Sequence, residues 1–318
     1  MPGNRSRRLC LWTFHFLRVG LAVALISVLT PRLCWGCACG CGIFDVQTNS
    51  MIPTGEGGTA YLEYDFMNQN RNWSGGSAAP AANNDDKQIR TSFWTAGAQY
   101  MLNRNWGVMG EVPYWGRFFK TTDDSGNIVG FDHSNFGDVR LRGIYSGFSP
   151  DMSTGITFGV KLPTGDYAYP NFDRDTAIGT GSTDILLGVF HTGRLSANNT
   201  WSWFSSAQLD APVLITGDYR PGGEIDAIAG VYYEGWTLGN LRIVPLAQAI
   251  GSGRLRDAGS QSASPDSGYG RLLLAPGIEV HAGNLKVNAD VGFPVVQSAN
   301  GNQLVAAQLY RVSVSHGF

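Results

Sequence analysis

Three cysteines stand close together near the start of the chain, at Cys37, Cys39 and Cys41. Thiolates at this spacing, with only Ala38 and Gly40 between them, can converge on a soft metal such as Cu(I) or zinc. The same residues could form a local disulfide in an oxidising compartment, or one of them could be acylated at the start of a mature chain. The pattern leaves metal binding, disulfide formation and lipid attachment open as alternatives.

Catalytic groups are harder to find. The histidines beyond residue 38 show no fixed spacing to a serine or a carboxylate that would form a nucleophile and its base: His133, His191, His281 and His316. Four aspartates offer oxygen ligands for a calcium ion in a loop, although their spacing is irregular: Asp166, Asp173, Asp175 and Asp184. We predict that the protein is not an enzyme and uses no cofactor.

Residues 1–38 have the three parts of a cleavable secretory signal peptide. A basic stretch up to Arg18 is followed by twelve apolar residues at 19–30 and by a short small-residue segment that ends at Ala38. Twelve apolar residues are too few to span a bilayer as a helix. We assign residues 1–38 to the signal peptide, 39–57 to a Cys- and Gly-rich periplasmic segment, and 58–318 to the body of the protein.

The charge balance argues against a nucleic-acid partner. The chain has 23 Lys and Arg against 25 Asp and Glu, and five of the basic residues lie in the first 38 positions, which contain no acid. The remainder therefore carries 23 − 5 = 18 basic and 25 acidic residues, a net charge of −7. Nucleic-acid binding needs a basic face that displaces counterions, and a net charge of −7 argues against one.

Apolar and polar residues alternate with a period of two from residue 58 onward, which is typical of β-strands with two different faces. Few charges (15%), 42 glycines and 12% aromatic residues are common in membrane barrels. Long connections alternate with short turns, as a barrel with two different rims requires. The sequence predicts an all-β fold, a transmembrane antiparallel up-and-down β-barrel of about twelve strands, at 58–69, 88–102, 106–120, 135–148, 153–162, 181–193, 200–213, 223–236, 240–251, 269–282, 285–297 and 302–318.

The polar face of these strands predicts the lumen, because a charge facing lipid at mid-depth costs about 2–4 kcal/mol. The predicted lumen-lining residues are Glu63, Asp65, Glu111, Arg117, Asp138, Arg140, Arg142, Lys161, Asp210, Asp226, Arg242, Arg271, Lys286, Asp290 and Arg311. Six tryptophans are expected near strand ends as membrane-interface anchors: Trp73, Trp94, Trp115, Trp201, Trp203 and Trp236.

The last strand carries a pattern of its own. Its apolar residues share one face and the chain stops at an aromatic residue: Tyr310, Val312, Val314 and Phe318. This arrangement resembles the insertion signal of bacterial outer-membrane barrels. The expected partners are therefore outer-membrane lipid and the barrel-assembly machinery, besides a small-molecule solute.

A family resemblance rests on two neighbouring motifs, KLPTGD at 161–166 and IGTGSTD at 178–184, with GDVRL upstream at 137–141. These resemble the signature of the outer-membrane family named after the meta-pathway of phenol degradation. The resemblance implies an outer-membrane transporter or channel whose cargo is hydrophobic and aromatic, and it brings no catalytic residues with it.

We therefore predict a channel of the bacterial outer membrane for small solutes, hydrophobic or aromatic in kind. Two alternatives stay open: a metal-binding outer-membrane protein that uses Cys37, Cys39 and Cys41, and a non-conducting structural barrel. The oligomeric state does not follow from the sequence.

Overall fold

The structure is a computed structural model, and it describes residues 52–53, 55–198 and 200–318. The predicted signal peptide, the three cysteines and most of the predicted segment 39–57 lie outside these residues. No helix in the described part is long and apolar enough to cross a bilayer.

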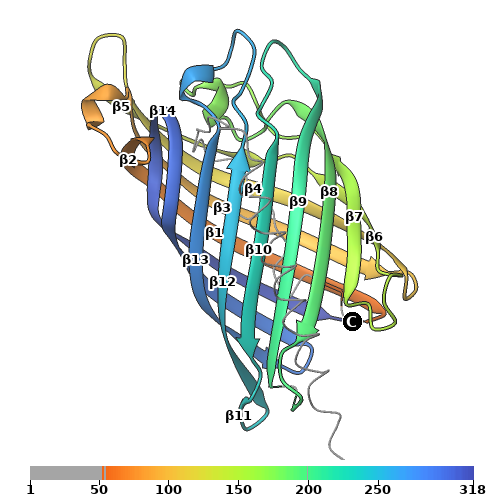
Figure 1. Ribbon diagram of the computed structural model, residues 1–318. Coiled ribbons are helices and arrows are strands. Elements are labelled where there is room, and N and C mark those ends of the chain that lie inside the picture. The colour runs from red at the N-terminus through yellow and green to blue at the C-terminus, as the bar shows by residue number, and fades with distance from the viewer. Residues whose placement is uncertain (1–51, 54, 199) are drawn as a thin grey trace, which may run out of the picture. The chain divides into compact units, whose positions relative to one another are not determined.

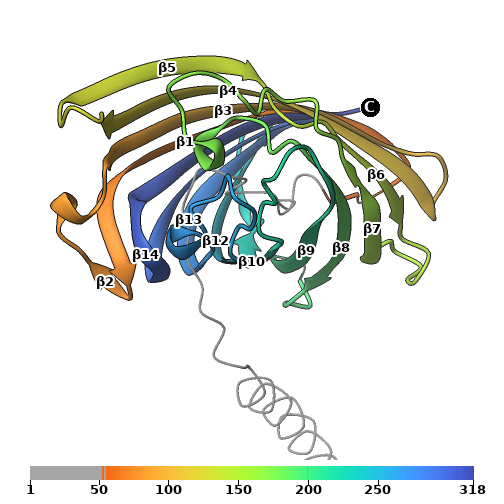
Figure 2. The same cartoon turned by 90° about the horizontal axis from the view of Figure 1, so that it is seen from above.

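Antiparallel strands form a closed ring, since β10 pairs with both β9 and β12 and so joins the two ends of the sheet. Figure 2 shows this ring from above, with β3 and β4 opposite β9 and β10. Eleven elements make up the ring: β1 (Gly57–Gly75), β3 (Asp86–Met101), β4 (Trp106–Thr122), β6 (Arg140–Tyr145), β7 (Thr154–Lys161), β8 (Ser182–Arg194), β9 (Trp201–Ile215), β10 (Glu224–Tyr233), β12 (Leu241–Arg254), β13 (Tyr269–Ala282) and β14 (Leu285–Gly317).

Smaller elements lie beside the ring or in its connections (Figure 1). Among the described residues, three further strands pair with ring strands, namely β2 (Ser77–Ala78), β5 (Ile128–Phe136) and β11 (Trp236–Leu238). The connections in the described part of the chain contain three single turns of 3₁₀-helix, namely η2 (Ala81–Asn83), η3 (Arg174–Thr176) and η4 (Ser264–Asp266).

β14 passes through the wall twice. Gly301 adopts a left-handed backbone with φ of +52°, and the Gly317 amide donates to the Asn284 carbonyl at 3.0 Å, so the two ends of β14 lie side by side. The two halves pair with β13 and with β1 respectively. The eleven elements therefore make twelve passes, which corresponds to the two separate strands expected at 285–297 and 302–318.

Alternating burial separates the two faces of the ring. In the second half of β14, Arg311 and Ser313 are buried at 1% and 2% exposure, while Tyr310 and Val312 between and beside them are 38% and 42% exposed. Consecutive side chains of a strand point to opposite faces. The exposed apolar set therefore covers the outside of the ring, and polar side chains occupy much of its inside.

Two rows of aromatic rings cross the outside of the ring. In one row Tyr64, Trp94, Tyr114 and Phe136 are successive cross-strand partners on β1, β3, β4 and β5. The other follows the short-turn rim and contains the contacts Tyr100–Phe318, Trp106–Tyr145 and Trp201–Tyr233. On β4 the two rows are eight residues apart, which is about 26 Å along a strand and less when the strand is tilted.

The predicted strand 135–148 is interrupted, and this corrects the sequence analysis. β4 pairs with β6 up to Glu111 and with β5 from Tyr114, so it changes partner around Pro113, which has no amide hydrogen to donate. The predicted loop 121–134 is mostly strand, because Asp123 accepts the amides of Ser125 and Asn127 and closes a tight turn. In the described part of the chain, β5 pairs only with β4, and its other edge has no partner strand.

Candidate functional site

Twelve of the fifteen predicted lumen residues are buried within the ring. The exceptions lie toward its rims. Arg242 is exposed at the short-turn end, where it pairs with Glu234 at 2.9 Å and reaches His281 at 2.7 Å. Lys286 is half-buried at the same end, and Arg271 is half-buried beneath the opposite rim, where its guanidinium lies over the Tyr269 ring. That these residues line a water path stays a prediction.

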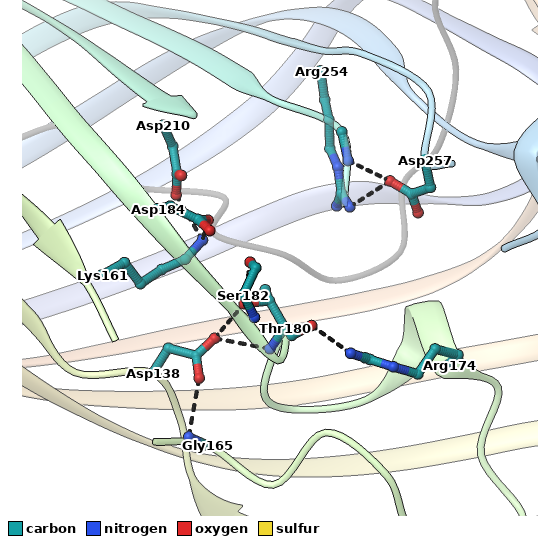
Figure 3. Close-up of polar contacts among 11 residues, drawn as sticks. Asp138, Lys161, Gly165, Arg174, Thr180, Ser182, Asp184, Asp210, Arg254 and Asp257 are labelled. Carbon is teal, nitrogen blue, oxygen red and sulfur yellow. Dashed lines mark hydrogen bonds and ion pairs between the residues drawn. The ribbon is translucent and has the colours of Figure 1, made fainter. Parts of the chain in front are cut away.

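One buried cation joins two buried carboxylates across three strands. Lys161 Nζ at the end of β7 lies 2.5 Å from Asp184 Oδ2 on β8 and 2.7 Å from Asp210 Oδ2 on β9 (Figure 3). Asp184 is only 1% exposed and was not among the predicted lumen residues. The alternation of β8 could have identified it, because it shares a face with the buried Leu186 and Phe190.

Two further groups of charges lie inside the ring. Glu111 pairs with Arg142 and accepts the Tyr61 hydroxyl at 2.6 Å. Arg311 lies between Glu63 and Asp65, with Nε–oxygen distances of 3.7 and 3.3 Å. Buried charges of both signs therefore pair with one another along the inner wall, and such pairing is how buried charges are tolerated.

The connection between β7 and β8, residues 162–181, folds over the mouth of the ring (Figure 2). Asp138, in the break between β5 and β6, holds both ends of this inward loop. One carboxylate oxygen accepts the Gly165 amide at 3.0 Å, and the other accepts the Thr180 amide at 2.8 Å and the Thr180 hydroxyl at 2.6 Å (Figure 3). The two motifs of the sequence analysis thus meet at one carboxylate.

Glycines allow the two ends of the inward loop to come into backbone contact. A Cβ added to Gly179 would lie 2.5 Å from the Gly165 backbone, which is closer than real side chains approach. Alanine at either position would push the loop strands apart. The glycines of the two motifs therefore serve close backbone contact.

The tip of the inward loop reaches the interior of the ring. Arg117 on β4 donates to the Ala177 carbonyl at 3.1 Å and also bonds the Thr176 carbonyl. Ile178 is 2% exposed and belongs to the buried apolar cluster, and its amide donates to the Tyr169 hydroxyl at 3.0 Å. Burial raises the pKa of the Tyr169 phenol, so this acceptor stays neutral.

Apolar side chains inside the ring form one cluster, which the sequence analysis did not anticipate. Trp115 packs edge-on against Phe93 with ring centroids 4.7 Å apart, and it is 7% exposed. The prediction that Trp115 anchors the membrane interface is therefore wrong. The cluster continues around the ring through Met67, Met109, Phe190, Phe204, Ile228, Ile250 and Leu273.

The remaining predicted positions are spread over the ring. Tyr310, Val312, Val314 and Phe318 are exposed on its outside, and Phe318 exchanges backbone hydrogen bonds with Gly58 at 2.8 and 2.9 Å.

The predicted calcium site is wrong for the described residues, because Asp184 binds Lys161 and no three His, Cys, Asp or Glu side chains there are placed to hold a metal ion.

Comparison with known proteins supports the fold. No protein-family model matches the sequence, and no curated protein matches it. The crystal structure of the COG4313 outer membrane channel from Pseudomonas putida F1 is similar to this chain with a TM-score of 0.64 and 13% identity, and the alignment covers 86% of this chain and 100% of that one. The chain therefore has the fold of an outer-membrane β-barrel.

Looser likenesses include the CymD monoaromatic hydrocarbon channel and the P. putida toluene transporter TodX. Their TM-scores are 0.41 and 0.42, and both are 11% identical to this chain. The alignments cover 83% of this chain and 89% of CymD, and 85% of this chain and 91% of TodX. The resemblance to the phenol-pathway family stays a prediction.

Proposed function

We propose that the protein is a channel of the bacterial outer membrane that carries small hydrophobic solutes, aromatic compounds among them. The observation that carries this proposal is the apolar cluster inside the ring. A pore for ions or sugars needs a polar interior, whereas here Phe93, Trp115 and Met109 lie among the ion pairs. Aromatic and methionine side chains offer an adaptable apolar surface to a ring-shaped solute.

The inward loop places this surface behind the mouth of the ring. Ile178 at the tip of the loop belongs to the same apolar cluster as Trp115. Arg117, beside them, lies over the Trp115 ring with its guanidinium carbon 5.5 Å from the ring centroid. A solute that enters past the inward loop therefore meets a binding surface with an apolar face and a cationic edge.

The outside of the ring supports a membrane location. The two aromatic rows lie where the two water–lipid interfaces of a barrel are expected, with exposed leucine and valine between them. The exposed face of Tyr310, Val312 and Val314 supports recognition by the barrel-assembly machinery. The similarity to an outer membrane channel of P. putida supports the same location at the level of the fold.

Two measurements test the proposal. In planar bilayers the purified protein should give discrete conductance steps, and a silent protein would contradict a channel. Calorimetric titration with indole as a soluble aromatic probe should show saturable binding that Trp115→Ala removes. Trp94→Ala is the matched control, because Trp94 is 44% exposed on the outside of the ring. Equal binding by both variants would contradict an interior aromatic site.

A further inference from the structure

A polar cleft of about 350 Å³ lies at the rim formed by the long connections. It is bounded by the segment from η2 to the start of β3, by η3 in the inward loop, by η4, and by the turn of the β14 hairpin. Five carboxylates line it: Asp85, Asp86, Asp173, Asp175 and Asp266. Three separate segments of the chain therefore bring negative charge to one cavity, and the turn of the β14 hairpin adds uncharged residues.

The basic residues nearby are already engaged. Arg174 is the one base among the lining residues, and its guanidinium lies 4.3 Å over the Tyr219 ring and donates to the Thr180 carbonyl (Figure 3). Lys87 follows Asp86 in sequence, and its ammonium donates to the carbonyls of Ala81 and Asn84. The lining side chains thus carry a formal excess of four negative charges, with five carboxylates against one guanidinium.

A buried acceptor in the cleft wall points to a ligand with N–H donors. Gln303 lines the cleft and is 3% exposed. Its Nε2 donates to the Asn300 carbonyl, which fixes the orientation of the amide, and its Oε1 has no hydrogen-bond partner. A buried acceptor left unpaired costs about 1–3 kcal/mol, so a donor bound at this oxygen recovers that energy.

Repulsion between the carboxylates of the cleft also favours a positively charged ligand. Burial raises the pKa of Asp173, and the neighbouring charge of Asp85 raises it further. The floor of the cleft is apolar, because Ile89 and Leu304 are buried there at 2% and 5% exposure. A ligand that fits must therefore supply positive charge to the walls and an apolar part to the floor.

The dimensions argue against a bare metal ion. Calcium needs six to eight oxygens within 2.3–2.6 Å. No three acidic, histidine or cysteine side chains in the described part of the chain are close enough to share a metal ion. The carboxylates surround a cavity large enough for a small organic molecule.

We propose that this cleft binds an organic polycation in which ammonium groups are joined by methylene chains. The ammonium groups pair with Asp86 and Asp173 and donate to Gln303 Oε1, while the methylenes lie on Ile89 and Leu304. This site does not depend on conduction through the ring, so the proposed channel function and the cleft can fail separately.

The test is calorimetric titration of the full-length protein in detergent with spermidine at pH 7.5 and low salt. We expect saturable binding that weakens about tenfold or more in the double variant Asp86→Asn/Asp173→Asn, because two facing charges are lost. The matched control is Asp124→Asn/Asp132→Asn, which removes two exposed charges from residues that do not line the cleft and should bind as the wild type does.

A second variant keeps the proposal testable if the double variant misfolds. Gln303→Met preserves the size of the side chain and removes the acceptor, so spermidine binding should weaken severalfold while the circular dichroism spectrum stays unchanged. Equal spermidine binding by wild type, cleft variants and control would overturn the proposal. Saturable binding of magnesium chloride without any binding of spermidine would also overturn it, because the cleft would then be a metal site.

Discussion

Replacing Asp138 by asparagine should release the inward loop. One carboxylate oxygen accepts both the amide and the hydroxyl of Thr180, and the other accepts the Gly165 amide. An asparagine side chain has one acceptor oxygen, so at least one end of the loop loses its bonds and faces an NH₂ group instead. Hydrogen bonds to a charged group contribute about 1.5–3 kcal/mol each, so closure should weaken by about 3 kcal/mol, or roughly a hundredfold in the population of the open loop.

Trypsin cleavage at Arg174 measures this opening, because Arg174 lies in the loop and bonds the Gly179 and Thr180 carbonyls while it is closed. We expect faster cleavage of the folded Asp138→Asn variant and longer high-conductance periods in planar bilayers. Asp151→Asn, in an exposed short turn, is the control and should behave as the wild type. Unchanged cleavage and conductance in Asp138→Asn would refute the assignment of Asp138 as the residue that holds the loop.

Three further outcomes follow from burial and charge. Lys161→Met leaves Asp184 and Asp210 facing each other without their cation, so stability should fall by about 3–5 kcal/mol; thermal unfolding in detergent measures this, and an unchanged midpoint would contradict it. Val189→Lys puts a charge on the outside of the ring, where Val189 is 54% exposed, and should cost about 2–4 kcal/mol in lipid vesicles but little in detergent. Asp173 binds its proton more tightly in the folded than in the unfolded chain, because its pKa is raised on folding. The stability of the protein should therefore increase as the pH falls through this raised pKa toward 3.8, and decrease as the pH rises. The difference in melting midpoint between wild type and Asp173→Asn should shrink on acidification, and a constant difference would contradict this sign.

Much of the wall follows from local alternation. A strand whose two faces meet different surroundings must alternate, and twelve such segments correspond to the twelve passes of the ring. The break at residues 137–139 does not follow from alternation. It depends on Pro113, which lies on another strand and has no amide hydrogen to pair there.

The interior was predicted only in part, for a physical reason. Polarity located buried charges such as Arg311 and Asp290, because lipid excludes them. The apolar residues of the inner face could not be predicted from polarity, since side chains such as Phe190 and Ile228 are compatible with either side of the wall. The contact of Asp138 with Thr180 could not be predicted either, because it joins two connections whose paths no periodicity describes.

The single-sided pairing of β5 bears on how deeply the protein is immersed. Hydrocarbon cannot satisfy a free row of backbone N–H and C=O groups, at a cost of several kcal/mol for each group, whereas water satisfies them readily. In the proposed membrane location the acyl chains therefore end below β5, close to the level where Phe136 meets Tyr114. The exposed Asp132 and Ser134 on that strand belong to the same wet layer. The unpaired edge of β5 thus indicates where the boundary between lipid and water lies on the outside of the barrel.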